Sequence, residues 1–466
     1  MAKISVVNAT YVRNEQRLDS GYYTPEILYA ISVINRCRYL LIENIYKELI
    51  HPKEFQRQYT KGGILLIRAQ NCRPVFLELH EKVYISKQIV QIIGESARVK
   101  GKDILLVRSG ANFGDVAIVP ENLNAYACAD VLILRVKENV ANPYYVGIYL
   151  NTKYGKVLLK RSGIGTAQPH LYTDGVLKIP VPTLSKDFQL HIEQLVKQAN
   201  EKRKLAEQKY QQAEELLYEL LGISKGEIER LDAEKAYETN FKEVKKAFRF
   251  DAEYYHPKYS ISDKIFKQIP SERLGNKEYF ELKKGIEVGS DAYCDENRGV
   301  LFLRVSNLSR NGLKLNPSDK YIFKGIYEKL EPKYEPKEGE VLFSKDGTIG
   351  TATVVDSDFP PFIISGGVVR IIIKKDFDPY YLAFILNSIL SKLQVTREKT
   401  GTVIEHLRFS KLKEIKVPKL PLSQQQEIAN LVKEYFKLRK EARQLIQRAI
   451  REVEEAIENA SRSNGE

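Results

Sequence analysis

The second half of the chain repeats the order of short motifs found in the first half, and this internal repeat constrains the fold more than any other feature. The paired motifs include RLDSGYYTPE with RFDAEYYHPK, ILLIRAQN with VLFLRVSN, NPYY with DPYY, and GTAQPHL with GTVIEHL. The later pairs lie about 236 residues apart. The chain is therefore a tandem duplication of one structural unit, and whatever it does it does twice.

Each unit begins with a region of about 180 residues in which short β-branched and aromatic runs are separated by glycine turns. DILLVRSG at 103–110 and VLFLRVSN at 300–307 are typical of these runs. Because the runs alternate with a few helical segments, we predict a compact α/β (α+β) domain with a mostly antiparallel or mixed sheet.

Each unit ends in a long helix with a heptad pattern. The segments 184–221 and 422–460 contain neither proline nor glycine, and their apolar residues recur in alternating steps of three and four. In the first helix the expected seam residues are Ile192, Val196, Ala199, Ala206, Tyr210 and Leu217, with Arg203 at one polar position. In the second helix they are Ile428, Leu431, Tyr435, Leu438 and Leu445. At 1.5 Å per residue each helix would be about 55 Å long.

Two such helices in one chain most simply pair with each other as an antiparallel coiled coil with pseudo-twofold symmetry, which would serve as a spacer between the two α/β domains. The alternative is that each helix packs on its own domain as an ordinary surface helix. We expect the domains at 1–183 and 246–420, the long helices at 184–222 and 421–460, a linker at 223–245 and a tail at 461–466.

The charge balance suggests a polyanionic partner. The chain has 73 Lys and Arg against 60 Asp and Glu, which leaves a net charge of +13. Such an excess favours nucleic acid, although a soluble protein can also simply be basic. The four cysteines form no CxxC pair, and no apolar stretch is long enough to span a bilayer. We therefore expect a cytoplasmic protein that has no membrane-spanning segment, no disulfide bond and no zinc site.

The tetrapeptides at Asn142 and Asp378 differ by one residue from the D/N-P-P-Y/F signature of amino-methyltransferases, because tyrosine replaces the second proline in both copies. Amphipathic helical sequence follows each of them, so Asn142 or Asp378 is expected to be an N-cap with proline at the first helical position. The sequence also lacks a P-loop, an HExxH pair and a complete nuclease motif. We therefore predict no catalytic residue and no metal site.

DNA binding has candidate residues at matching places of both halves, where donor side chains stand in turns or follow strands. In the first half they are Arg68, Gln70, Asn71, Arg108, Ser109, Asn112, Thr166, Gln168 and His170. In the second half they are Arg304, Ser306, Asn307, Lys345, Asp346, Thr348, Thr402 and His406. For each group the alternative is a turn or a structural hydrogen bond.

Residues that are equal in both halves cannot explain two different target sequences. Arg17 with Asp19 and Arg249 with Asp251 recur beside the Tyr-Tyr pairs, so an internal salt bridge is favoured for them. Positions that differ between the halves are expected to carry specificity. Two such differences are Gln70 against Ser306 and Gln168 against Ile404.

The repeated order of these motifs, with two long helices, resembles the DNA-specificity subunit of Type I restriction–modification systems over essentially the whole chain. The resemblance implies that each α/β domain is a target recognition domain that reads one half of a split, asymmetric site in double-stranded DNA. It implies that the helices set the gap between the half-sites and dock two methyltransferase (modification) subunits, with restriction/translocase subunits joining the complex.

The resemblance also implies that this chain is not an enzyme and holds no cofactor. S-adenosylmethionine, ATP and Mg²⁺ are expected on the partner subunits. A different class of protein stays open, namely a stand-alone duplicated nucleic-acid-binding scaffold protein without a methyltransferase partner.

Overall fold

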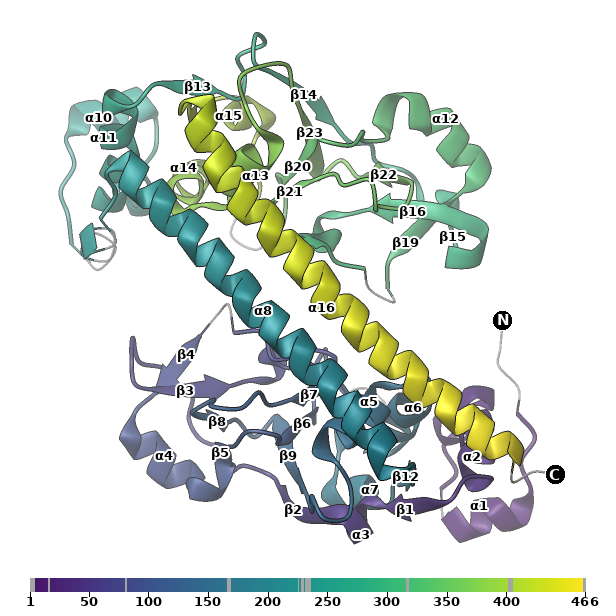
Figure 1. The fold of residues 1–466 in the computed structure, drawn as a ribbon. Coiled ribbons are helices and arrows are strands. Elements are labelled where there is room, and N and C mark those ends of the chain that lie inside the picture. The colour runs from purple at the N-terminus through teal and green to yellow at the C-terminus, as the bar shows by residue number, and fades with distance from the viewer. Residues whose placement is uncertain are drawn as a thin grey trace. The chain divides into compact units, whose positions relative to one another are not determined.

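The computed structural model describes residues 5–15, 17–79, 82–165, 169–224, 226–227, 230, 236–315, 318–400 and 405–463. The chain divides into two compact units (Figure 1). The first unit comprises Met1–Arg203 with Lys440–Glu466, and the second comprises Lys204–Arg439. Each unit therefore contains one α/β domain and a half of each long helix.

The first unit is built on an antiparallel sheet with the strand order β2-β9-β6-β7. Its strands are β2 (Tyr46–Ile50), β6 (Ile104–Val107), β7 (Val116–Ile118) and β9 (Val131–Val136). Side chains of β6 alternate between two cores: Ile104 and Leu106 pack in the core shared with the helices, whereas Leu105 and Val107 pack in the core shared with a second sheet. Both faces are covered, which explains why the strand reads as an unbroken apolar run.

The second sheet of the first unit has the order β4-β3-β8-β5, in which β3 and β8 are parallel. Its strands are β3 (Ile64–Ile67), β4 (Val83–Ile85), β5 (Arg98–Val99) and β8 (Ala125–Ala127), and α4 (Lys87–Ile93) follows β4. The predicted mixture of antiparallel and mixed sheets is confirmed in this unit.

Helices cover the outer face of the first sheet. They are α2 (Pro25–Asn35), α5 (Pro143–Asn151) and α6 (Lys153–Arg161). The smaller elements are α1 (Ala9–Glu15), η1 (Ser20–Tyr23), β1 (Tyr39–Leu41), α3 (Ile42–Ile45), η2 (Ala69–Asn71), η3 (Glu95–Ala97), β10 (Gly163–Ile164), β11 (His170–Leu171), α7 (Thr173–Leu177) and β12 (Pro180–Pro182). β1 pairs with β12, so the start of the domain is joined to the strand that leads into the long helix.

The second unit follows the same plan, with a first sheet in the order β14-β23-β20-β21 and a second in the order β15-β19-β16-β22. The strands are β14 (Phe280–Lys284), β15 (Tyr293–Cys294), β16 (Gly299–Leu303), β19 (Lys320–Phe323), β20 (Val341–Ser344), β21 (Ala352–Val354), β22 (Phe362–Ile364) and β23 (Val368–Ile373). The second sheet ends in β22, whereas in the first unit the corresponding β8 is followed by β5. The duplicated framework has therefore diverged at a sheet edge.

The helices of the second unit also match those of the first. They are α10 (Phe241–Ala247), α11 (Ser260–Gln268), α12 (Lys324–Tyr334), α13 (Pro379–Asn387), α14 (Ile389–Glu398) and α15 (Phe409–Leu412). The remaining short elements are η4 (Ala252–Tyr255), η5 (Pro257–Tyr259), β13 (Ser271–Arg273), η6 (Ser290–Ala292), η7 (Glu296–Arg298), η8 (Val305–Asn307), β17 (Leu308–Ser309), β18 (Gly312–Leu313) and β24 (Lys416–Pro418). β13 pairs with β24 as β1 pairs with β12.

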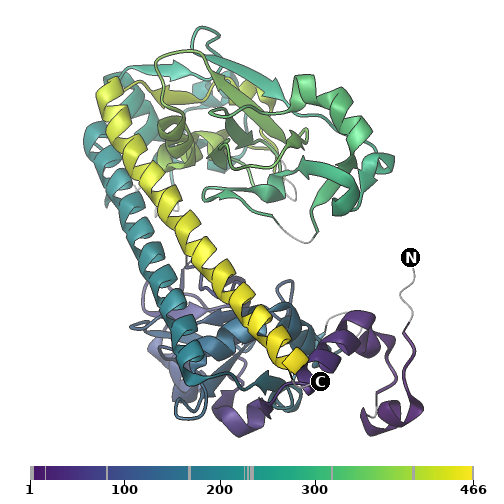
Figure 2. The ribbon, with the colours of Figure 1, turned by 45° about the vertical axis from the view of Figure 1, so that its right-hand side comes forward.

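The long helices are α8 (Lys186–Leu221) and α16 (Leu422–Ser463), and their segments lie side by side within each unit (Figures 1 and 2). In the first unit, ion pairs join His191 to Glu452 at 2.8 Å and Lys202 to Glu441 at 2.5 Å. In the second unit, Arg439 pairs with Glu207 at 3.1 Å. As the residue number on α8 increases, the residue number of its partner on α16 decreases. The predicted antiparallel pairing is therefore confirmed.

The heptad positions of each long helix pack partly on the other long helix and partly on the α/β domain. Among the expected seam residues, the buried ones are Ile192, Val196, Ala199, Ala206, Leu217, Ile428 and Tyr435, and the half-buried ones are Tyr210, Leu431, Leu438 and Leu445. Val432 and Ile446, next to two of the half-buried leucines, are buried in the domain cores. Each helix therefore pairs with its neighbour and also packs on its domain, so the two arrangements weighed from the sequence hold together.

No helix in the described part of the chain is long and apolar enough to cross a membrane. All four cysteines are free, as their spacing predicts. Burial of Cys37, Cys72 and Cys128 raises the pKa of each thiol, so these residues behave as small apolar core side chains.

Candidate nucleic-acid interface

In the first unit the structure brings the predicted DNA-binding segments together at one place. We call residues 68–71 the strand-end turn and residues 108–114 the glycine turn. The amide of Leu171 donates to the carbonyl of Arg108 at 3.0 Å, and the Asn112 side chain lies 3.5 Å from the carbonyl of Ala69. Segments far apart in sequence therefore form one cluster, which includes His170.

The strand-end turn of the first unit is held by Asn71. Its side-chain oxygen accepts from the amide of Arg68, and its nitrogen donates to the carbonyl of Glu78, both at 2.9 Å. Asn71 is buried, while Gln70 is exposed and Arg68 is half-buried. The turn therefore displays Arg68 and Gln70, and the amide of Asn71 is used within the protein.

The glycine turn presents a basic side chain beside a small polar network. The Arg108 guanidinium lies 5.7 Å from the ring centre of Tyr172. The buried hydroxyl of Ser109 donates to Asp130 at 2.8 Å. Gly110 has a φ of 89°, a left-handed conformation that favours glycine. Ser109 therefore fixes the turn, and Arg108 and Asn112 are its accessible polar side chains.

Sequence reasoning missed a loop that joins this cluster. Arg57 forms an ion pair with Asp130 at 2.9 Å, and the Arg68 guanidinium lies 5.9 Å from the ring centre of Tyr59. Both residues belong to the segment HPKEFQRQYTK, in which basic and aromatic residues alternate with polar ones. That interleaving is a known feature of nucleic-acid contacts and could have identified the loop.

The second unit has an equivalent strand-end turn at 304–307. Asn307 is fully buried, and its side chain accepts from the amide of Arg304 at 2.9 Å and donates to the carbonyl of Lys314 at 3.0 Å. Ser306 is exposed, and Arg304 reaches the carbonyl of Ser318 at 3.3 Å. The geometry of the turn is the same as in the first unit, but serine replaces the exposed glutamine.

The glycine turn of the second unit, residues 345–350, meets His406 in a cluster of three polar side chains. His406 Nδ1 lies 2.9 Å from an Asp346 carboxylate oxygen, and Lys345 forms an ion pair with the same carboxylate. The backbone joins the segments too, because the amide of Gly347 donates to the carbonyl of Glu405 at 2.9 Å. Burial raises the pKa of Asp346, but hydrogen bonds from Lys345 and His406 outweigh it and leave the pKa below its usual value. Asp346 is therefore a carboxylate at neutral pH.

The two clusters share their backbone plan and differ in their exposed chemistry. The accessible polar side chains are Arg68, Gln70, Arg108, Asn112 and His170 in the first unit and Arg304, Ser306, Lys345, Asp346, Thr348 and His406 in the second. The buried residues Asn71, Asn307 and Ser109 support their turns instead. Thr166, Gln168, Thr402 and Ile404 lie outside the described residues.

The tetrapeptides that resemble a methyltransferase signature are helix starts. Asn142 accepts hydrogen bonds from the amides of Tyr144 and Tyr145, and Pro143 is the first residue of α5. Asp378 caps α13 in the same way. The predicted N-caps are confirmed in both units, and the oxygens that a methyltransferase would aim at a base are hydrogen-bonded to the backbone instead.

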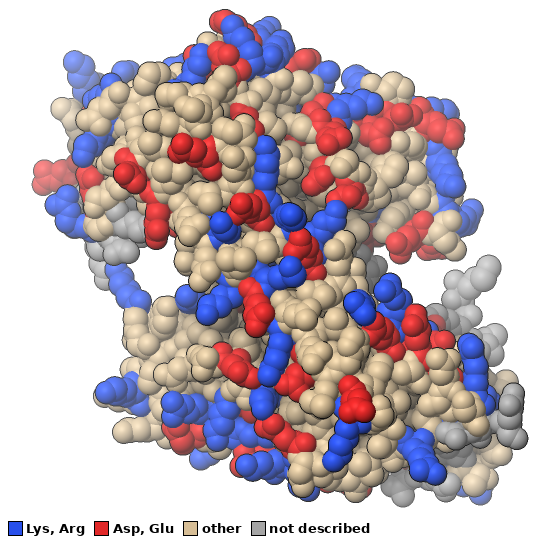
Figure 3. Space-filling view, viewed as in Figure 1, with Lys and Arg blue, Asp and Glu red and all other residues tan. Residues whose placement is uncertain are grey.

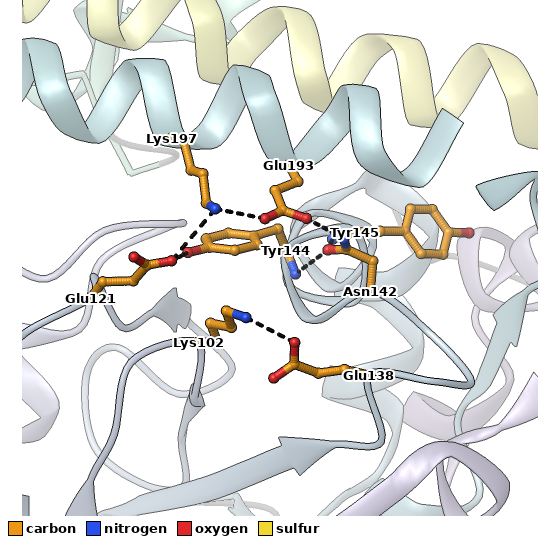
Figure 4. A network of polar contacts seen from close by, with 8 residues as sticks. All are labelled: Lys102, Glu121, Glu138, Asn142, Tyr144, Tyr145, Glu193 and Lys197. Atoms are coloured by element: carbon orange, nitrogen blue, oxygen red, sulfur yellow. Dashed lines mark hydrogen bonds and ion pairs between the residues drawn. The ribbon is translucent and has the colours of Figure 1, made fainter. Parts of the chain in front are cut away.

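The cap of α5 is tied to α8 by a polar network (Figure 4). The side-chain nitrogen of Asn142 donates to Glu193 at 2.5 Å. The Lys197 ammonium lies 2.8 Å from the Glu193 carboxylate and 3.5 Å from that of Glu121. Burial raises the pKa of Glu193, but hydrogen bonds from Lys197 and Asn142 outweigh it and keep the pKa below its usual value. This network joins the α/β domain of the first unit to its long helix.

Tyr145 and its counterpart Tyr381 point the other way, into the core. The Tyr145 hydroxyl donates to the carbonyl of Pro182 at 2.7 Å, and the Tyr381 hydroxyl donates to that of Pro418 at 3.0 Å. Burial raises the pKa of both phenols well above the ordinary range. These residues fasten the strand that precedes each long helix, so they have a structural role.

The repeated Arg-x-Asp pairs are internal, as predicted. Arg17 contacts Asp19 at 2.7 Å, and Arg249 contacts Asp251 at 2.6 Å. Each guanidinium also lies over a tyrosine ring, at 4.6 Å from the centre of Tyr22 in the first unit.

The described residues contain no group of three or more His, Cys, Asp or Glu side chains placed to hold a metal ion. On the face drawn in Figure 3, lysine and arginine side chains are interspersed with aspartate and glutamate. On that face, the charge excess of the chain is therefore spread out and does not form one continuous basic patch.

Residues 272–448 match the family model of the Type I restriction modification DNA specificity domain. No curated relative matches the chain. Among solved structures, the chain is similar to the S subunit of a Type I restriction-modification system from M. genitalium, at 12% identity and a TM-score of 0.39, with 92% of this chain and 96% of that chain covered. It is also similar to the HsdS subunit from Thermoanaerobacter tengcongensis, at 14% identity and a TM-score of 0.28, with 92% and 96% covered. Because both TM-scores are low, the assignment rests on the sequence match, which confirms the resemblance noted above for residues 272–448.

Proposed function

Because residues 272–448 form a Type I restriction modification DNA specificity domain, we propose that the whole chain is the DNA-recognition subunit of a Type I restriction–modification system. Each unit would read one half of a bipartite, asymmetric site. The α/β domain of the first unit lies outside the matched residues, but it has the same first sheet, the same capped helix and the same pair of turns as that of the second unit.

The observation that carries this proposal is the convergence of the turns in each unit. In the first unit three segments distant in sequence meet, and two of them are turns fixed by the buried side chains of Asn71 and Ser109. In the second unit Asn307 fixes the strand-end turn, and the glycine turn is joined to the segment that carries His406. Backbone rigidity with exposed donors is what base reading requires, because a donor must hold its position to discriminate between base edges.

The residue types that are at least partly accessible match the chemistry of DNA. Arg68 and Arg304 suit a bidentate contact with guanine, and Gln70 suits one with adenine. In the second unit, Lys345 and His406 flank the Asp346 carboxylate, which can accept a hydrogen bond from cytosine. Because these side chains differ between the units, the two half-sites would differ in sequence.

The long helices would dock two modification subunits, with restriction/translocase subunits added to that complex. On α8, Leu190 is 52% exposed and Leu205 is 43% exposed, and on α16 the first residue, Leu422, is 59% exposed. Apolar groups on the outer faces of paired helices suit further helices from a partner.

The chain itself would be non-catalytic and would bind no cofactor. S-adenosylmethionine, ATP and Mg²⁺ would belong to the partner subunits. The use of Asn142 and Asp378 as helix caps supports this division, because it removes the residues that most resemble a methyltransferase site.

The experiment is to express the chain with the methyltransferase subunit from its own operon and to map methylated adenines by long-read sequencing. We expect a bipartite asymmetric motif that disappears when this chain is deleted. Methylation that keeps its motif without the chain would refute the proposal. In that case, sequence-independent and salt-sensitive DNA binding by the purified chain would favour the scaffold alternative.

A further inference from the structure

A short loop follows the strand-end turn in each unit and contacts the long helices. In the first unit this connecting loop comprises residues 72–79, and in the second it comprises residues 308–314. Each loop is tied back to its turn by an equivalent backbone hydrogen bond. The amide of Glu78 donates to the carbonyl of Asn71 at 2.8 Å, and that of Lys314 donates to the carbonyl of Asn307 at 2.8 Å.

In the first unit the connecting loop meets α8 at Arg203. The Arg203 guanidinium lies 3.9 Å from the ring centre of Phe76, and it donates to the carbonyl of Leu77 at 3.4 Å. Arg203 is the one polar residue among the heptad positions of this helix. The polar interruption of the seam is therefore the point at which the loop is held.

The same connecting loop contains a strained residue. Val75 is buried and has a φ of 70°, a conformation that is unfavourable for a β-branched side chain. Its amide donates to the carbonyl of Val116 at 2.8 Å, and its carbonyl accepts from the amide of Ile118 at 2.9 Å. Such strain persists only where the surrounding contacts hold the backbone in place. The loop is therefore clamped between the sheet and α8.

In the second unit the connecting loop reaches both long helices by different chemistry. Its tip lies between β17 and β18, and the Arg310 guanidinium is 5.0 Å from the ring centre of Tyr210 on α8. The Tyr435 hydroxyl of α16 donates to the side-chain oxygen of Asn311. Tyr210 and Tyr435 also contact each other, with ring centres 5.1 Å apart.

We infer that the connecting loops are positioning elements. Their contacts with the long helices fix the position of each strand-end turn, so that a helix contact controls base discrimination in one half-site. This inference rests on the proposed function. In the first unit the path runs from Arg203 through Leu77 and Glu78 to Asn71, next to the exposed Gln70. In the second it runs from Tyr435 to Asn311 at the tip of the loop, and the loop returns to Asn307 through Lys314.

Two features separate this role from simple packing. The contacts are directional and polar, although an apolar residue at position 203 would suit a heptad seam better. In both units a connecting loop meets a long helix, while the side chains and the helices that make the contact differ. A contact kept with changed chemistry is expected if the position of the turn is the property that the contact serves.

The test uses the complex of the full chain with its modification subunit and measures methylation of duplexes that carry one wrong base in either half-site. Arg203→Leu should lower discrimination on the order of tenfold in the half-site read by the first unit and leave the other half-site unchanged, because about 1.4 kcal/mol per base is tenfold. Asn311→Ala should lower discrimination in the half-site read by the second unit and leave that of the first unit unchanged. Arg451→Leu, on an exposed side of α16, is the matched control and should change neither.

Arg203→Lys provides a second test that does not depend on the fold surviving a leucine, because it keeps the charge and loses the planar stacking group. It should show a smaller loss in the same half-site. Equal losses in both half-sites, or no loss from Arg203→Leu and Asn311→Ala in stably folded complexes, would overturn the inference. A wild-type complex without any sequence-specific methylation would instead refute the proposed function.

Discussion

Replacing Asn71 with alanine tests whether this residue supports the strand-end turn or belongs to its recognition surface. Asn71 is 3% exposed, and its side chain makes hydrogen bonds to Arg68 and Glu78. Each bond contributes about 0.5–1.5 kcal/mol, and a buried group left without a partner costs about 1–3 kcal/mol. We therefore expect Asn71→Ala to lower the local stability of the turn by about 2–4 kcal/mol. Gln70→Ala, at the neighbouring exposed position, should change stability by less than about 0.5 kcal/mol.

Hydrogen–deuterium exchange on peptides that cover residues 64–79 is the suitable assay, because a chain with two units need not unfold in one step. Asn71→Ala should speed exchange in these peptides without affecting those of the second unit. Gln70→Ala should leave exchange unchanged and weaken discrimination at one base. If Asn71→Ala left exchange unchanged and abolished base discrimination, Asn71 would be a base-reading residue, as the sequence suggested, and the reasoning from its burial would be refuted.

Three further predictions concern an ion pair, pH and helix length. Arg370 and Glu340 form a buried bidentate pair at 2.7 and 2.8 Å, so Arg370→Ala should lower the free energy of unfolding of the second unit by about 3–5 kcal/mol in urea, whereas Arg370→Met with Glu340→Leu should cost much less. Because hydrogen bonds keep the pKa of Glu193 below its unfolded value of about 4.3, its stabilising effect is present above that pH and is lost as pH falls through the folded pKa. Glu193→Gln should therefore be destabilising at pH 7, and the destabilisation should shrink as pH falls below about 4.3. Inserting seven residues into each long helix adds about 10.5 Å, which should widen the gap between methylated half-sites by about three base pairs.

Each of these predictions can fail in a specific way. Equal destabilisation by the single and the double variant at Arg370 would mean that packing, and not an unpaired buried charge, is lost. A stability difference between wild type and Glu193→Gln that does not shrink as pH falls below about 4.3 would contradict the role of the carboxylate. An unchanged gap in the methylated motif after the insertion would remove the helices as the determinant of spacing.

The duplicated framework explains how one chain could read two different sequences. The turn-supporting residues, such as Asn71 and Asn307, are the same in both units, so the backbone of the turn is the same. The neighbours Gln70 and Ser306 are exposed and lie outside the core, so they can change with little cost to the fold. Recognition chemistry can therefore diverge while stability is maintained.

Several features of this protein follow from local sequence patterns alone. The repeat predicted two units of one design, the heptads predicted two long helices, and Asn142 and Asp378 predicted helix starts. These features depend on short-range periodicity and on capping chemistry, which act within a few turns of a helix or a few residues of a strand.

Tertiary structure decided which polar residues are accessible. Asn71 and Gln70 are adjacent in a turn, yet one is buried in the support of that turn and the other faces solvent. The pairing of Arg57 with Asp130 and the seating of Phe76 under Arg203 join residues tens to more than a hundred positions apart. No local pattern encodes such contacts, because they arise only when separate strands and helices pack and their side chains compete for the same buried partners.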